Sequence, residues 1–195
     1  IHDLVLQMGL GSDLAIGNTL VHMYAKCGNL KGAQKVFDDV LNPDVVSFGA
    51  LISGYSHQGH GVLALDLFRQ MQAKGIKPER ATFLSLLRAC AHMSAGRHGN
   101  LIYGQIVENQ LDSGLLISNA LVDMYAKTGR LYDAYKIYMQ MSSQDVVSCG
   151  TMIEGFTQQG DNEVAREILK GMSDTGVKPD DAIFSSILTG CSNAG

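Results

Sequence analysis

Apolar residues recur along this chain at intervals of three and four residues, the spacing that aligns side chains on one face of an α-helix. Two such segments follow each other between residues 14 and 44, and the first ends at Gly28 while the second ends at Pro43-Asp44. Their apolar positions are Ile16, Leu20, Val21, Met23, Tyr24, Ala33, Val36, Phe37 and Val40. The pattern predicts two helices joined by a short turn, which is a helical hairpin.

The hairpin plan repeats along the rest of the chain. The predicted hairpins are 31 residues long at 14–44 and 115–145, and 35 residues long at 45–79, 80–114 and 146–180. Residues 1–13 fit the end of an earlier hairpin, and residues 181–195 fit the first helix of a later one. In 45–79 we expect Ser47 to cap the first helix, and Gly59 and Gly75 to end the two helices. No alternating apolar and polar run is long enough to favour a β-sheet.

An internal repeat accounts for this regularity. The phrase NTLVHMYAKCG at Asn18–Gly28 returns as NALVDMYAKTG at Asn119–Gly129, 101 positions later, and the same offset joins Asp44 to Asp145. Repeated hairpins stack so that each contacts mainly its neighbours and together they bury one continuous core. The sequence therefore predicts an all-α solenoid. In it Met23, Tyr24 and their counterparts in the second copy pack in the core.

Composition narrows the partners that such a chain can have. It is 46% hydrophobic and 17% charged, and no apolar run reaches the roughly 18 residues of a membrane span. The formal net charge is −4, whereas a protein that holds nucleic acid through phosphates alone is normally basic. Any nucleic-acid binding must therefore be led by contacts to bases, and we expect no membrane partner.

The sequence carries no pattern that indicates an enzyme or a cofactor site. There is no phosphate-binding loop, no nucleophile elbow, and neither the H-x-E nor the C-x-x-C of a zinc deaminase. His57 and His60 stand three apart, but no cysteine or acid completes a metal site, so we interpret them as surface residues. The four cysteines lack a paired spacing and are expected to be reduced core residues rather than metal ligands or disulfides: Cys27, Cys90, Cys149 and Cys191.

Three phrases make the family resemblance specific. The segment VVSFGALISGYSHQG at 45–59, the endings GIKPE at 75–79 and GVKPD at 176–180, and the alternation of 31 and 35 residues resemble the pentatricopeptide repeat family. They are similar to its plant-type subclass of short, standard and long motifs. The resemblance covers essentially the whole chain and implies a right-handed superhelix. It makes 14–44 and 115–145 short motifs, 45–79 and 146–180 standard motifs, 80–114 a long motif, and 1–13 and 181–195 truncated long motifs.

The resemblance also implies a function. This family binds single-stranded RNA, one nucleotide per motif, and the fifth and last residues of each motif read the base. Carried onto this chain, the reading pairs are Asn18 with Asp44, Gly49 with Glu79, Asn119 with Asp145, and Gly150 with Asp180. The asparagine–aspartate pairs resemble those that prefer uracil, whereas the two glycines remove the side-chain contact. The long motif offers only Leu84 and Gly114, which have no polar group for a base.

Two further sets of positions follow from the resemblance. The second residue of each motif sandwiches the base between apolar side chains, and here these residues are Ala15, Val46, Ala81, Leu116, Val147 and Ala182. The thirteenth residue reaches a phosphate, and it is a lysine at Lys26 and Lys127, whereas His57, His92 and Gln158 occupy the place elsewhere. Two lysines give only a weak dependence on salt, so base contacts must supply most of the affinity.

The predicted RNA-contacting residues also have ordinary structural interpretations. Asparagine is common at helix starts, aspartate is an ordinary turn residue, and most lysines are simply surface residues. At the level of function, the leading hypothesis is the RNA-recognition part of an organellar cytidine-to-uridine editing factor, in a mitochondrion or chloroplast, with the chemistry supplied elsewhere. The alternative is a helical scaffold that binds small editing-cofactor proteins through its long motifs. The apolar helix at 181–195, which has no partner helix, also predicts end-to-end self-association.

Overall fold

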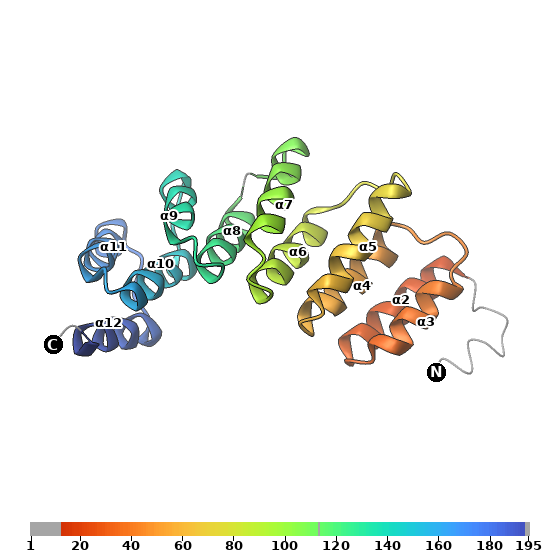
Figure 1. The fold of residues 1–195 in the computed structure, drawn as a ribbon, viewed down its shortest axis with the longest axis horizontal. Helices are drawn as coiled ribbons and strands as arrows, with labels where there is room; N and C mark the ends of the chain where they lie inside the picture. The colour runs from red at the N-terminus through yellow and green to blue at the C-terminus, as the bar shows by residue number, and fades with distance from the viewer. Residues whose placement is uncertain (1–12, 113, 194–195) are drawn as a thin grey trace. The chain divides into compact units, whose positions relative to one another are not determined.

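A computed structural model describes residues 13–112 and 114–193 of the chain, and within them it contains eleven α-helices and no β-strand (Figure 1). The prediction of an all-α fold is confirmed. Most of the predicted earlier hairpin end, residues 1–13, lies outside the described residues. The helices are α2 (Leu14–Lys26), α3 (Leu30–Asp39), α4 (Val45–His57), α5 (Gly61–Ala73), α6 (Arg80–His92), α7 (Gly96–Glu108), α8 (Leu115–Lys127), α9 (Leu131–Gln140), α10 (Val146–Gln159), α11 (Asn162–Thr175) and α12 (Asp181–Asn193).

The chain divides into two compact units, an N-terminal unit of residues 1–93 and a C-terminal unit of residues 94–195. In the N-terminal unit α2, α4 and α6 pack against one another in sequence, and α3 and α5 pack on α2 and α4 as their hairpin partners (Figure 1). In the C-terminal unit α8, α10 and α12 form the equivalent row, with α9 and α11 as the partners of α8 and α10. We call α2, α4, α6, α8, α10 and α12 the first helices.

Bulky apolar side chains between neighbouring helices fill the core of each unit. Phe48, Phe83 and Phe156 are completely or almost completely buried on first helices. Burying such a side chain contributes about 1.5–3 kcal/mol to folding. Small residues let the first helices approach closely: a Cβ at Gly54 would lie 2.7 Å from that of Ala25. Hydrophobic burial and these close approaches therefore hold the stacked hairpins together.

The cap of α4 differs from the sequence prediction. Asp44, not Ser47, is the N-cap residue, because its carboxylate accepts hydrogen bonds from the backbone N–H groups of Val46 and Ser47 at 3.0 Å. Ser47 is the third helical residue, and its hydroxyl accepts from the Asp44 N–H at 3.1 Å. The two residues thus form a reciprocal capping box, and the prediction of Ser47 as the cap was wrong.

The helix ends mostly follow the predicted glycines. Gly28, Gly59 and Gly75 follow the ends of α2, α4 and α5 and have φ values between 69° and 81°, a left-handed conformation that favours glycine. The second helix of the first hairpin ends earlier than predicted, at Asp39 rather than at Pro43, because the chain becomes extended at Val40. Which hairpins are short, standard or long motifs remains a prediction.

Two sequence expectations concern surfaces. No helix in the described part of the chain is long and apolar enough to cross a membrane. The last helix, α12, buries Ile183 against its neighbours but leaves Phe184 and Leu188 exposed. That exposure motivates the expected self-association, which stays a prediction.

Candidate functional site

Asn18 and Asp44 meet at the junction of the first two described hairpins. Asn18 lies in the second turn of α2, and its side-chain amide donates to the Asp44 carboxylate at 3.1 Å. The Ser47 hydroxyl donates to the carbonyl oxygen of the same amide. Partial burial raises the pKa of Asp44, but the backbone N–H of Ser47 and the Asn18 amide outweigh it and hold that pKa below its usual value. The ionised carboxylate therefore fixes the orientation of the asparagine amide.

The second pair has the same geometry 101 residues later. The Asn119 amide donates to Asp145 at 2.9 Å, and the Ser148 N–H donates to the same carboxylate at 2.8 Å. Burial again raises the Asp145 pKa, but the Ser148 N–H and the Asn119 amide outweigh it, so the pKa lies below its usual value. One detail differs, because the Ser148 hydroxyl donates to a backbone carbonyl and Asn119 Oδ1 has no hydrogen-bond partner among the described residues. The structure thus brings both predicted asparagine–aspartate pairs together.

The two glycine positions form no such pair. A Cβ at Gly49 would have Thr82 Oγ1 as its nearest neighbour, 3.7 Å away, and one at Gly150 would meet Ile183 at 3.4 Å. Glu79 precedes α6 without a side-chain capping bond. Asp180 instead accepts from the Ile183 N–H at 3.0 Å and so caps α12. Without a side chain at the fifth position, Glu79 and Asp180 have no amide to orient.

The predicted residues of the long motif offer no polar group either. Leu84 is a half-buried residue of α6 in the N-terminal unit. Gly114 precedes α8 in the C-terminal unit with φ 126°, a backbone conformation available mainly to glycine. Each therefore has a packing or turn role that needs no ligand.

Exposed aliphatic side chains accompany the two pairs. Val46 and Val147 are 54% and 56% exposed on the first turns of α4 and α10, the helices that Asp44 and Asp145 cap. Leu116, near the start of α8, is 66% exposed, and Ala15 is exposed at the start of α2. These four residues are among the positions predicted to sandwich a base. Apolar side chains beside an oriented amide provide a surface against which a flat ring can stack.

A cationic cluster lies at the other end of the first helices in the N-terminal unit. Lys26, His57, Arg88 and His92 make up this cationic cluster, and a groove of about 220 Å³ beside it is lined by His22, Lys26 and His57. Burial lowers the His57 pKa, and the charges of Arg88, Lys26 and His92 lower it further. The Arg88 guanidinium lies 2.8 Å from the His57 ring. Sequence reasoning missed Arg88, since it approaches His57 only once α4 and α6 pack together.

The equivalent place in the C-terminal unit is different. Lys127 lies 2.8 Å from Asp123 and forms an ion pair with it, and Asp123 is the counterpart of His22. Gln158 stands where His57 stands in the N-terminal unit. The lysine of the C-terminal unit is thus partly neutralised, whereas Lys26 lies among other cations.

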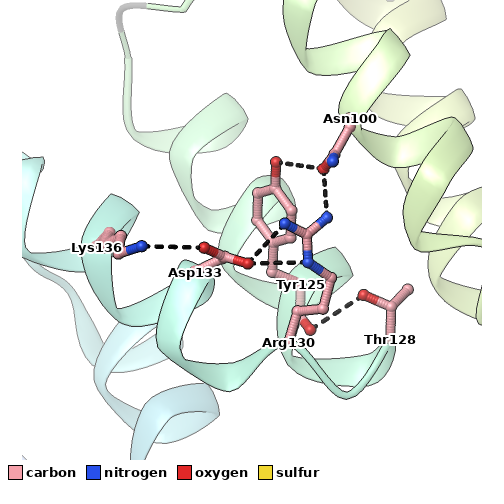
Figure 2. Close-up of polar contacts among 6 residues, drawn as sticks. All are labelled: Asn100, Tyr125, Thr128, Arg130, Asp133 and Lys136. Atoms are coloured by element: carbon pink, nitrogen blue, oxygen red, sulfur yellow. Dashed lines mark hydrogen bonds and ion pairs between the residues drawn. The ribbon is translucent and has the colours of Figure 1, made fainter.

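A polar network in the C-terminal unit holds α8, which carries Asn119 and Lys127 (Figure 2). The Tyr125 hydroxyl and the Arg130 guanidinium both donate to Asn100 Oδ1, at 3.0 and 2.6 Å. Arg130 also lies 5.0 Å from the centre of the Tyr125 ring and donates to Asp133 at 2.9 Å. The hydrogen bonds from Arg130 depress the Asp133 pKa. We call Asn100, Tyr125, Arg130 and Asp133 the Arg130 network, and it connects α7, α8 and α9.

The cysteines match the prediction of reduced core residues only in part. Cys90 and Cys149 are buried and free, and burial raises the pKa of Cys90 to about 11. Cys27 is exposed after α2, so the expectation of a core cysteine there was wrong. Among the described residues, no three His, Cys, Asp or Glu side chains form a group that could hold a metal ion.

Comparisons with family models place most of the chain within repeats. A model of the PPR repeat family matches residues 43–92 and 144–193, and a model of the PPR repeat matches residues 18–42 and 117–146. The starts of these matches lie close to the starts of α4 and α10 and within α2 and α8.

Curated relatives match over the full length of the chain. Pentatricopeptide repeat-containing protein At4g18520, chloroplastic, and pentatricopeptide repeat-containing protein At2g03880, mitochondrial, both of Arabidopsis thaliana, are each 34% identical to all of it. Putative pentatricopeptide repeat-containing protein At3g23330 of the same species is 36% identical. The chain spans 31% of the first two and 27% of the third, so it corresponds to less than a third of each relative.

Solved structures share the fold. The pentatricopeptide repeat protein PPR10 from maize aligns with 98% of this chain and 29% of its own at a TM-score of 0.82 and 23% identity. PPR10 in complex with an 18-nt psaJ RNA element aligns with 93% of this chain and 28% of its own, with a TM-score of 0.77 and 24% identity. The PPR domain of Arabidopsis thaliana protein-only RNase P 1 in complex with tRNA aligns with 92% of this chain and 98% of its own, with a TM-score of 0.75 and 14% identity.

Proposed function

Because the chain belongs to the pentatricopeptide repeat family, we propose that it binds single-stranded RNA along its first helices, one base to each hairpin. The observation that carries the proposal is the recurrence of an oriented asparagine–aspartate pair, with exposed aliphatic residues beside it, at the same place in both units. The similar proteins PPR10 and protein-only RNase P 1, solved with RNA, support it.

The chemistry of each pair suits uracil. An asparagine amide has one donor group and one acceptor, and the Watson–Crick edge of uracil also offers both. Because the aspartate accepts from the amide nitrogen, the carbonyl oxygen faces the base as the acceptor; Asn119 Oδ1 has no partner among the described residues, and Asn18 Oδ1 keeps a second lone pair beside its bond from the Ser47 hydroxyl. Val46, Val147, Leu116 and Ala15 would stack on the base faces and replace the stacking that a base loses when it is bound singly.

The two units would contact the RNA backbone unequally. The cationic cluster offers Lys26 and Arg88 together with imidazoles that can gain charge, whereas Lys127 already has the Asp123 carboxylate as its partner. Phosphate contacts strengthen binding by releasing counterions, in proportion to the number of charges neutralised. The N-terminal unit would therefore supply most of the salt-dependent affinity, and base contacts would supply the selectivity.

We further propose that the chain is the target-recognition part of an organellar cytidine-to-uridine editing factor of the subclass with short, standard and long motifs. Its hairpin lengths of 31, 35 and 35 residues support that subclass, and relatives named chloroplastic and mitochondrial support an organelle. In this role the chain binds RNA, with no catalysis of its own, and the deaminase is supplied by another domain or protein.

Titration with short single-stranded RNAs tests the RNA-binding proposal. The reference RNA carries uridines three positions apart, where the two short motifs would read them. Changing either uridine to adenosine should weaken binding about tenfold, which corresponds to about 1.4 kcal/mol, because the amide loses its matching edge. The control changes the nucleotide at the long motif and should have little effect. Equal affinity for uridine and adenosine at both positions would remove the base-reading role and favour the protein scaffold instead.

A further inference from the structure

A groove of about 270 Å³ lies in the C-terminal unit, and Cys149 of α10 is among its lining residues. Most of its other lining residues belong to α9 and α11, not to α8, which carries Asn119. Its main lining residues are Tyr135, Tyr138, Met139, Glu167, Gly171 and Met172. Apolar walls with one acidic side chain give this groove a chemistry that RNA phosphates do not match.

The internal repeat explains why the groove is open here. The counterpart of Cys149 is Phe48, whose buried ring packs edge-on against Phe37 with ring centres 4.9 Å apart. At Cys149 that ring is missing, and the Tyr138 hydroxyl lies 3.4 Å from the smaller sulfur. Gly171 likewise stands where the N-terminal unit has Gln70. Two reductions in side-chain size at equivalent positions therefore leave space in one unit that a ring fills in the other.

The walls of the groove favour a cation on an apolar stem. The Tyr135 and Tyr138 rings are stacked, with centres 6.2 Å apart and planes 18° from parallel, and Tyr135 is half-exposed. Glu167 is exposed at the rim and forms no ion pair with any described residue, whereas its counterpart Asp66 is paired with Arg69 at 2.7 Å. Aromatic rings and a carboxylate attract cations, and the exposed thioether of Met139 accommodates methylene groups.

We propose that this groove is a docking site for a lysine or arginine side chain presented by a partner protein. The charged end lies between the Glu167 carboxylate and the half-exposed Tyr135 ring, and the aliphatic stem packs on the exposed Met139 side chain, above the nearly buried Ile168 and Met172. Long cationic side chains bind in this way because their stems are apolar while their heads keep a polar contact. The charge complementarity of Glu167 and the tyrosine faces is what assigns a cationic occupant.

Short blocked peptides provide the direct test. The peptides Ac-GGKGG-NH2 and Ac-GGRGG-NH2 are titrated into the protein with ¹³C-labelled methionine and isoleucine methyl groups, and the norleucine peptide of the same length is the neutral control. We expect a cationic peptide to shift the methyl signals of Met139, Met172 and Ile168 and to bind at least about tenfold more tightly than the norleucine peptide. Equal binding of all three peptides, or no shift with either cationic peptide, would overturn the proposal.

Two substitutions locate the binding. Gly171→Gln copies Gln70, and it fits because nothing lies within 4 Å of a Cβ built at Gly171. Glu167→Gln removes the charge and keeps the shape. Both substitutions should weaken binding of the cationic peptide at least about fivefold, because Gly171→Gln fills the opening of the groove and Glu167→Gln removes its negative charge. Asp66→Asn, the matched change in the N-terminal unit, should leave binding unchanged. Unaltered affinity in both groove variants would place the peptide elsewhere and refute the assignment.

Discussion

At the scale of single residues, Asp44 and Asp145 each perform two tasks. Each caps the next first helix and at the same time holds the amide of the asparagine on the previous one. The same carboxylate therefore affects both folding and the proposed base recognition. Effects on stability and on RNA binding can be separated because the asparagine can be replaced while the aspartate cap stays in place.

Asp145→Ala should lower the free energy of unfolding by about 1 kcal/mol at pH 7, because α10 loses its N-cap. The folded-state pKa of Asp145 is depressed, so its ionised form stabilises the fold above its unfolded pKa, near 3.8. That contribution is lost as the pH falls through the lower folded pKa. Urea unfolding at pH 7 and below pH 3 should therefore show a difference between wild type and variant that shrinks with acid.

The control is Glu79→Ala, since Glu79 precedes α6 without a capping bond and should change stability little. A difference between wild type and Asp145→Ala that stays constant across this pH range would contradict the role given to the ionised carboxylate.

His57 gives a second prediction at this scale. In the free protein its pKa is lowered by burial and by the nearby cations, so the ring is largely neutral at pH 7. A bound phosphate would favour the charged ring, raise that pKa and cause proton uptake on binding. RNA affinity should therefore increase as the pH falls from 7.5 to 6. His57→Gln, which copies Gln158, should flatten this dependence in titrations at constant salt; an unchanged pH profile would exclude His57 from phosphate binding.

Individual residues show what the sequence could and could not predict. The offset of the internal repeat predicts that Asn18 with Asp44 and Asn119 with Asp145 are equivalent, and the structure joins both pairs. The ion pair of Lys127 with Asp123 was foreseeable from its four-residue spacing on a helix. Arg88 beside His57 was not, because that contact depends on how two helices pack.

At the scale of helices, glycines and the three- and four-residue apolar spacing were enough to predict which segments are helical. They did not predict the capping boxes at Asp44 and Asp145 or the early end of α3, since caps depend on local hydrogen bonds. They also could not predict the Arg130 network, which joins residues from three helices (Figure 2). Such contacts between side chains of different helices depend on tertiary packing, which local sequence patterns do not show.

Arg130→Leu should destabilise the C-terminal unit by about 1–3 kcal/mol, because Asn100 and Asp133 lose a charged partner and Tyr125 loses its stacked cation. Amide hydrogen exchange should speed up most at the α8–α9 turn. The control is Lys136→Ala, which removes only an exposed ion pair of 3.3 Å, worth about 0–1 kcal/mol. Equal losses in the two variants would show that the Arg130 network does not act as a connection between helices.

At the scale of the whole molecule, the 101-residue repeat gives two units with the same plan and different surfaces. The N-terminal unit has the cationic cluster, whereas in the C-terminal unit Asp123 pairs with Lys127. The N-terminal unit has the buried Phe48 ring where the C-terminal unit has Cys149, which lines an open groove. The sequence shows these substitutions, but only the structure shows their consequences for charge and space. The two units therefore suit unequal contributions to the proposed RNA binding.

The measurement that tests this account most directly is a double-substitution cycle between Asn119 and the base it is proposed to read. RNA affinity is measured for wild type and Asn119→Ala, each with uridine or adenosine at that position. We expect a coupling of about 1 kcal/mol or more, and no coupling between Asn119 and the uridine assigned to Asn18. Additive effects at both positions would contradict the claim that each short hairpin reads one base through its asparagine.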